Sequence, residues 1–392
     1  SISSLSTYLV HPNSSINKMG NSIEGYSDTA EKPTRSSHKG NGPITSKETE
    51  TGHMDTTNDD KYASGNDMPS IRFAVSSMQG HRATMEDTHI LAPSLRIPSR
   101  NKSVEKVLLD HALFSVFDGH GGDFTADYSS KNFLRVLMER EEWTKYANLD
   151  KSLRKEVPGI LLLKSALSNA FVDIDNELQK IYRNRIEMYG SATSLTRGRS
   201  RKQKTLEKAD DVRDSTESSR GLSPEPLSHR IMVDRSGSTA VMVLLTPSHI
   251  ICSNAGDSRA IFSRGGEFLP LSFDHKPSHG RELNRIKEAG GFVKYKRVDG
   301  DLAVSRGLGD FRFKLNDALS DKTQKVSSVP EILLYPRDHK KDQFIILGCD
   351  GIWDVMANQD CVNVVQGLLD EGNKDLGKLC EKMLDICLER NS

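Results

Sequence analysis

Residues 112–122 read ALFSVFDGHGG, a short apolar run that ends in the step Asp118-Gly119. Its alternating apolar and β-branched residues predict a buried strand. A second apolar run, FIILGCDG at 344–351, ends in the same step at Asp350-Gly351. Asp-Gly alone is a common hairpin turn, but a carboxylate at the mouth of a buried strand needs a cation. We therefore interpret Asp118 and Asp350 as candidate metal ligands.

Further carboxylates stand in short polar motifs along the chain. Glu86 and Asp87 lie in HRATMEDTH, Asp257 in NAGDSR and Asp310 in AVSRGLGD. Carboxylates without a Cys/His cluster of zinc-like spacing favour Mg²⁺ or Mn²⁺ over zinc. Two adjacent ions of this kind can hold a phosphate and activate a water molecule. The residues thus indicate phosphate ester hydrolysis without a covalent enzyme intermediate.

The segments around these motifs alternate between strand and helix patterns. Strands are predicted by β-branched alternation and helices by apolar residues at helical spacing. We expect an α+β fold, a central antiparallel β-sandwich flanked by pairs of α-helices in α-β-β-α layers. The predicted strands are 71–77, 88–92, 112–119, 238–245, 249–263, 267–272, 292–296, 332–335 and 343–351, and the predicted helices are 124–139, 159–182, 278–291, 360–371 and 376–389.

Composition divides the 392 residues into one domain and two polar segments. Residues 1–68 are rich in Ser, Thr, Asn and Gly without a periodic apolar face, which predicts a disordered tail. A second polar stretch at about 190–234 predicts a mobile insertion, leaving 69–392 as a single interrupted domain. The 54 basic and 54 acidic side chains balance, which excludes a whole-chain polycation that binds nucleic acid by charge.

The cysteines and the N-terminal region indicate where in the cell the protein is located. The five cysteines form no CxxC pair, which is typical of reduced thiols in the cytoplasm or nucleus. The apolar runs are too short to cross a bilayer. A start at Met19 would expose Gly20 for N-myristoylation, although Glu24 replaces the expected Ser or Thr. We expect peripheral membrane association only if Gly20 is acylated.

Seven motifs occur in an order that resembles the metal-dependent Ser/Thr protein phosphatases, the type 2C or PPM family. The resemblance covers nearly all of 69–392 outside the insertion. It implies a type 2C fold and hydrolysis of phosphoserine and phosphothreonine in proteins. The motifs are RATMED (82–87), FDGHGG (117–122), SGSTAV (236–241), NAGDSRA (254–260), DHKP (274–277), LAVSRGLGD (302–310) and CDGIWD (349–354).

The resemblance also implies metal ligands. Asp118 would bridge two Mg²⁺ or Mn²⁺ ions, with the Gly119 carbonyl on one and Asp350 on the other. Glu86, beside Asp87, resembles a ligand that acts through water, and Asp257 resembles a residue that helps to hold a weaker third ion.

Two further residues resemble the family's catalytic groups. Arg82 corresponds to the phosphate-binding arginine, whose planar fork suits two phosphate oxygens. His120 corresponds to the general acid that protonates the leaving oxygen. Asp310 and Asp354 resemble supports of the site. We expect a monomer whose partners are phosphorylated proteins.

One departure from the family pattern keeps alternatives open. The family's domain ends in a strand with Asp-Asn that supplies a last metal ligand, whereas this sequence stops at CLERNS. Asp175-Asn176 does not replace it, because that pair lies in a predicted helix. We expect the natural chain to continue past Ser392. The alternative is a catalytically impaired pseudophosphatase that acts as a scaffold. A hydrolase of small phosphate esters is a third interpretation.

Overall fold

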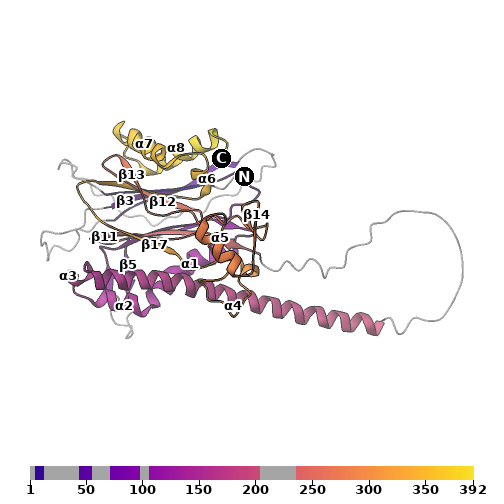
Figure 1. The fold of residues 1–392 in the computed structure, drawn as a ribbon. Helices are drawn as coiled ribbons and strands as arrows, with labels where there is room; N and C mark the ends of the chain where they lie inside the picture. Colours follow the sequence, from indigo (N-terminus) through magenta and orange to yellow (C-terminus); the bar gives the residue numbers. More distant parts are fainter. Residues whose placement is uncertain (1–4, 13–43, 55–70, 98–105, 204–234) are drawn as a thin grey trace.

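Two antiparallel sheets stacked face to face form the centre of the computed structural model, with helices on both outer faces (Figure 1). The structure describes residues 5–12, 44–54, 71–97, 106–203 and 235–392. One sheet has the strand order β13-β12-β18-β1-β3-β2 and the other β17-β11-β10-β7-β4. The predicted layered α+β fold is confirmed.

The bounds of the elements follow the predicted segments closely. The strands of the two large sheets are β1 (Leu5–Pro12), β2 (Ile44–Met54), β3 (Ile71–Gly80), β4 (Thr88–Ala92), β7 (Ala112–Phe117), β10 (Ala240–Leu245), β11 (His249–Ala255), β12 (Arg259–Arg264), β13 (Glu267–Pro270), β17 (Glu331–Pro336) and β18 (Asp342–Gly348). The short strands are β5 (Leu95–Ile97), β6 (Lys106–Leu108), β8 (Gly119–His120), β9 (Gly237–Ser238), β14 (Val293–Lys294), β15 (Arg297–Val298) and β16 (Leu308–Gly309). The helices are α1 (Phe124–Glu139), α2 (Glu141–Asn148), α3 (Lys151–Arg154), α4 (Val157–Gln203), α5 (Gly280–Glu288), α6 (Asp350–Trp353), α7 (Asn358–Asp370) and α8 (Leu376–Glu389), with a 3₁₀ turn at Phe311–Phe313.

Alternation along the strands explains the three layers of core. In β10, Val241 and Val243 pack between the sheets, while Met242 and Leu244 pack against the layer of α1, α2 and α4. Because both faces of this strand are covered, its sequence is continuously apolar. A third cluster joins the six-stranded sheet to α6, α7 and α8.

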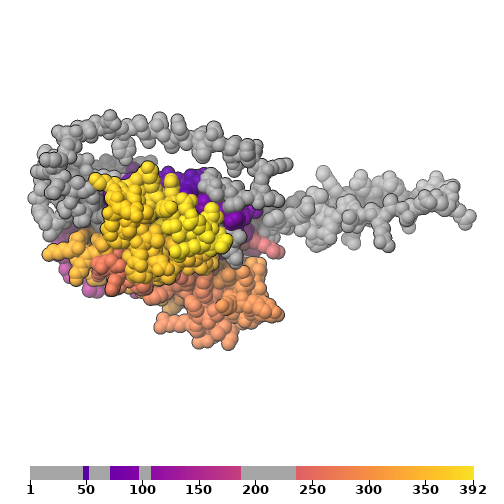
Figure 2. Space-filling model, turned by 90° about the horizontal axis from the view of Figure 1, so that it is seen from above, coloured from indigo at the N-terminus to yellow at the C-terminus, as the bar shows by residue number. Residues whose placement is uncertain are grey.

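A small lobe carries α5 and the hairpin β14-β15 on one side of the sandwich. Its own core includes Ile286, Val298 and Phe313. In Figure 2 this orange segment projects beside the yellow C-terminal helices. We call residues 278–328 the α5 lobe.

Two predictions about polar segments are wrong in part. The tail predicted as disordered contains β1 and β2, and β1 pairs with both β18 and β3 in the middle of its sheet. The insertion predicted from about residue 190 begins as helix, because α4 runs to Gln203. Gly20 and residues 204–234 lie outside the described residues. By length and composition Val157–Ile186 of α4 could cross a membrane, but 44% of its apolar window is buried in the protein, as in a core helix.

Candidate active site

Asp118 lies directly after β7, at the edge where several predicted ligands gather. Burial raises its pKa well above the ordinary value, and the carboxylates of Asp87, Asp350 and Asp257 raise it further. A hydrogen bond from the backbone of Asp350 offsets part of this rise. The fold thus brings four predicted ligands within electrostatic range of one another. Such a concentration of buried negative charge favours binding of a cation.

Lys276 is a cation that the fold supplies to this cluster. Its ammonium group forms a short ion pair with Asp257, whose side chain is buried. Burial raises the pKa of Asp257 to about 6, against the opposing effect of Lys276. Lys276 belongs to the DHKP motif, one of the seven motifs of the resemblance. The sequence did not predict its ion pair with Asp257. The ion pair places positive charge beside the predicted third-metal residue.

The donor atoms of the cluster suit a hard divalent ion, because they are oxygens. Among the residues that the structure describes, however, no three His, Cys, Asp or Glu side chains stand close enough together to hold an ion. The ligand set of Asp118, Gly119, Asp350, Glu86, Asp87 and Asp257 therefore stays a prediction.

His120 forms the best-defined polar contact of the site. Its Nε2 lies 2.7 Å from Asp310 Oδ2, and Asp310 is fully buried while about a third of the His120 side chain is exposed. A three-stranded sheet builds this pair, because β9 lies between β8 and β16. Gly237 of β9 is in register with His120 on one side and Gly309 on the other.

Electrostatics favour the protonated form of His120. Burial lowers the pKa of its imidazole, but the contact with Asp310 outweighs burial, so the pKa is raised overall. Asp257 and Glu86 act in the same direction. An imidazole that stays protonated near neutral pH is suited to donate a proton. The role of His120 as the general acid stays a prediction.

Two glycines let the backbone approach the site closely. A Cβ at Gly237 would collide with Asp310 Oδ2 and His120 Nε2, and a Cβ at Gly119 would collide with the main-chain oxygen of Glu86. Both positions need glycine for space rather than for an unusual backbone conformation.

Arg82 and Glu86 lie in the connection between β3 and β4. Arg82 is exposed, and its main chain is held by Gln79, which receives the Arg82 N–H at 3.4 Å and donates Nε2–H to the Arg82 carbonyl at 2.8 Å. Glu86 Oε1 accepts a hydrogen bond from Thr84 at 2.9 Å. The Arg82 side chain is thus exposed to solvent.

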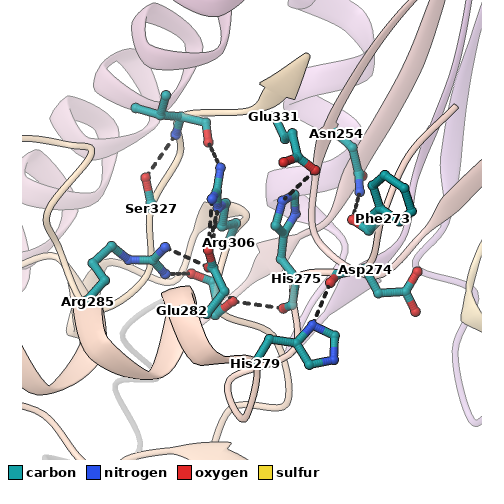
Figure 3. Close-up of polar contacts among 12 residues, drawn as sticks. Asn254, Phe273, Asp274, His275, His279, Glu282, Arg285, Arg306, Ser327 and Glu331 are labelled. Carbon is teal, nitrogen blue, oxygen red and sulfur yellow. Dashed lines mark hydrogen bonds and ion pairs between the residues drawn. The ribbon is translucent and has the colours of Figure 1, made fainter. Parts of the chain in front are cut away.

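A charged network ties the α5 lobe to the site (Figure 3). Glu282 of α5 contacts Arg306 at 2.8 Å and Arg285 at 2.6 Å. The Ser305 hydroxyl donates to Glu282 at 2.6 Å, and the Ser305 main-chain N–H donates to the carbonyl of His275 at 3.0 Å. His275 Nδ1 in turn accepts the Gly256 N–H at 3.2 Å, as expected for a buried turn histidine. Glu282 lies in a helical pattern typical of a surface helix, so its local sequence gives no signal of this network.

Comparisons with known proteins find relatives over most of this chain. The family model described as "Protein phosphatase 2C" matches residues 71–196 and 164–392. "Protein phosphatase 2C homolog 2" of Saccharomyces cerevisiae is 32% identical over 317 residues, covering 80% of this chain and 53% of that protein. "Protein phosphatase 1B" of Bos taurus is 34% identical over 322 residues, covering 82% and 54%. The chain thus spans about half the length of these relatives.

A solved structure supports the fold. The crystal structure of serine-threonine phosphatase 2C from Toxoplasma gondii aligns with a TM-score of 0.55 at 20% identity, over 90% of this chain and 93% of that one. A Caenorhabditis elegans sex determining protein aligns with a TM-score of 0.52 at 20% identity, over 91% and 64%.

Proposed function

Because the chain belongs to the protein phosphatase 2C family, we propose that it hydrolyses phosphoserine and phosphothreonine in proteins with the help of Mg²⁺ or Mn²⁺. The observation that carries the proposal is the contact between His120 and the buried Asp310, within electrostatic range of the carboxylates of Asp257 and Glu86. One side of the site can donate a proton and the other can hold cations. A scaffold protein would need neither.

The bound ions would supply a water molecule acidified enough to attack phosphorus at neutral pH. Asp118, Asp350, Asp87 and Asp257 would hold them, with Glu86 acting through water and the Gly119 carbonyl completing the set. Burial and mutual repulsion make these carboxylates costly to keep charged without a cation. Their arrangement therefore favours binding of the metal ions.

The chain's own side chains would handle phosphate and the leaving group. Arg82, exposed at the end of β3, would bind two phosphate oxygens through its planar guanidinium. His120 would protonate the seryl or threonyl oxygen as its bond to phosphorus breaks. Since Asp310 engages Nε2, Nδ1 is the nitrogen left to donate that proton. Asp310 fixes the ring and favours its charged form.

Turnover of a phosphothreonine peptide in the presence of Mn²⁺ tests this proposal. The wild-type chain should release phosphate, and chelation with EDTA should abolish the release. Asp118→Asn, which removes one charge from the centre of the cluster without changing its size, should lose nearly all of the Mn²⁺-dependent rate while remaining folded. Near wild-type activity in this variant would refute the assignment.

A further inference from the structure

A buried ion pair lies behind the site, in a position that the catalytic mechanism does not use. Lys314 Nζ contacts both carboxylate oxygens of Asp175, at 2.9 Å and 2.8 Å, and the two side chains are only 5% and 6% exposed. Asp175 belongs to α4, whereas Lys314 follows the motif that contains Asp310. The pair joins an outer helix to a catalytic segment.

Both members of the pair also bind the main chain of that segment. Asp175 Oδ1 accepts the Gly309 N–H at 2.8 Å, and Lys314 donates to the Gly307 carbonyl at 2.9 Å. These two bonds flank Leu308 and hold β16 from the side opposite β9. The backbone that leads into Asp310 is therefore fixed by a charged clamp, which we define as Asp175 and Lys314.

The segment needs such support because its backbone is unusual. Gly309 and Asp310 have consecutive positive φ values of 72° and 51°. Residues other than glycine are uncommon in this left-handed region, although Asp adopts it more often than most, and the conformation persists where the surroundings impose it. The side chain of Asp310 contacts His120 through Oδ2, while its Oδ1 is buried without a hydrogen-bond partner among the described residues. The position of Asp310 Oδ2 thus depends on the main chain.

The clamp is a poor device for stability alone. Burying two charges costs free energy that their attraction offsets only in part, and apolar replacements of buried ion pairs are often neutral or stabilising. Burial raises the pKa of Asp175 despite the opposing effect of Lys314. An apolar pair of similar size could not form the two hydrogen bonds to the main chain of Gly307 and Gly309.

We propose that Asp175 and Lys314 are positioning residues that hold the main chain of 307–310 so that Asp310 aims His120 at the leaving oxygen. This inference rests on the proposed phosphatase function. Asp175 does not replace the family's terminal metal-ligand Asp, but the proposal gives it a role in positioning Asp310.

The decisive variant is the double substitution Asp175→Leu with Lys314→Met, which leaves no buried charge behind. The matched control is Asp342→Leu with Arg264→Met. The Asp342 side chain is likewise buried, pairs with Arg264 at 2.6 Å and accepts a main-chain N–H from Asp338 at 2.8 Å. Asp342 is the first residue of β18, however, whereas Asp350 follows the other end of this strand. The control therefore removes a similar clamp that has no link to Asp310.

Leaving-group dependence separates positioning from a general structural defect. Threonine is a poor leaving group and needs a proton, whereas p-nitrophenolate leaves without one. In the clamp variant we expect kcat for a phosphothreonine peptide to fall at least about tenfold, a fraction of what a general acid contributes. KM and the turnover of p-nitrophenyl phosphate should stay within about twofold, as expected when only the proton donor is displaced. In the control variant both substrates should change by the same factor.

A double-mutant cycle with His120→Gln completes the kinetic test. If the clamp acts through His120, adding the clamp substitutions to His120→Gln should cause no further loss with the phosphothreonine peptide. Equal losses on both substrates, or full additivity with His120→Gln, would overturn the proposal. Should the double variant fail to fold, Asp175→Asn keeps an oxygen for Gly309 and should show the same substrate selectivity in weaker form.

Hydrogen exchange gives a readout that needs no activity. The amides of residues 307–313 should exchange faster in the clamp variant than in the wild-type chain or the control, because local opening there becomes easier. Unchanged protection of this segment would also overturn the proposal. If the wild-type chain turns over neither substrate, the proposed function fails, while the exchange result still shows whether the clamp holds the segment.

Discussion

His120 Nε2 and Asp310 Oδ2 lie 2.7 Å apart although 190 residues separate them in the chain. Three short strands bring them together, and Gly237 in the middle strand leaves room for the contact. The pair connects the Asp-Gly motif after β7 to the GLGD motif that contains β16. Proton donation in the proposed reaction depends on this long-range contact.

Gly237→Ala should separate the pair. A Cβ at this position would collide with both contacting atoms, so one of the two side chains must move. We expect kcat for a phosphothreonine peptide to fall by about 10²-fold or more, the usual contribution of general acid catalysis, with little change for p-nitrophenyl phosphate. Gly280→Ala is the control, since nothing lies within 4 Å of its added Cβ. Wild-type kinetics in Gly237→Ala would contradict the proposed role of the pair.

Asp118→Asn should reverse the order of stability with and without metal. Burial and neighbouring carboxylates raise the pKa of Asp118 in the folded state, so its charge destabilises the metal-free fold increasingly as the pH rises above the ordinary value. Without metal at pH 7.5, the variant should have the higher Tm.

Added Mn²⁺ at about 100 times its Kd should raise the Tm of the wild-type chain by about 4 °C, the effect of roughly 2.7 kcal/mol of binding on a domain of about 300 residues. The variant should gain little. Differential scanning calorimetry with EDTA and with Mn²⁺ measures both shifts. A variant that gains as much from Mn²⁺ as the wild-type chain would show that Asp118 is not a ligand.

Glu282→Gln should destabilise the fold in a pH-dependent way. Burial raises the pKa of Glu282, but Arg306 and Arg285 outweigh it and lower the pKa to about 2. The stability that the charge contributes is therefore fully present above the unfolded value near 4.5 and is lost as the pH falls toward 2. At pH 7 we expect a cost of about 3 kcal/mol in the free energy of unfolding.

Urea unfolding across this pH range measures the difference between Glu282→Gln and the wild-type chain. The difference between their free energies of unfolding should become smaller below pH 4.5. Glu267→Gln is the control, since Glu267 is exposed and should change stability by less than about 0.5 kcal/mol. A constant gap at every pH would mean that packing, rather than charge, explains the loss.

Arg82→Ala should weaken substrate binding more than it slows the chemical step. Arg82 is exposed in the connection after β3, so its removal should leave the fold intact. We expect KM for a phosphothreonine peptide to rise about tenfold, the loss of a charge-assisted contact of about 1.5 kcal/mol. Arg82→Lys should recover only part of this, because lysine lacks the planar fork. An unchanged KM in Arg82→Ala would place phosphate binding elsewhere.

Local patterns predicted most of the fold because the buried strands and amphipathic helices carry strong periodic signals. Val241 to Leu244 in β10 and the apolar residues of α8 illustrate this, since both segments form as predicted. β1 was missed because its short alternating stretch is surrounded by Ser- and Asn-rich sequence. The helical end of α4 was missed because its residues are polar and offer no apolar face.

The site was predictable at the level of motifs but not of contacts. Asp118, Asp350 and Asp257 each stand beside a strand that the sequence marks clearly, so their gathering follows from the fold. Lys276 pairs with Asp257, 19 residues away, and Asp175 pairs with Lys314, 139 residues away, and no local pattern reports either pairing. Asp175 in particular sits in a helix, where an inward-facing carboxylate looks like any polar residue until its partner is placed.

The central place of β1 has a consequence for how the chain is made. Thr7 pairs with Ser76 of β3 on one side and with Gly348 of β18 on the other. β1 therefore leaves the ribosome long before β18, the strand that covers its second edge. Until then the open edge can pair with other chains. During synthesis the six-stranded sheet thus stays incomplete until β18 is made. The yield of the protein in cells should depend on how well the open edge of β1 is protected in that interval.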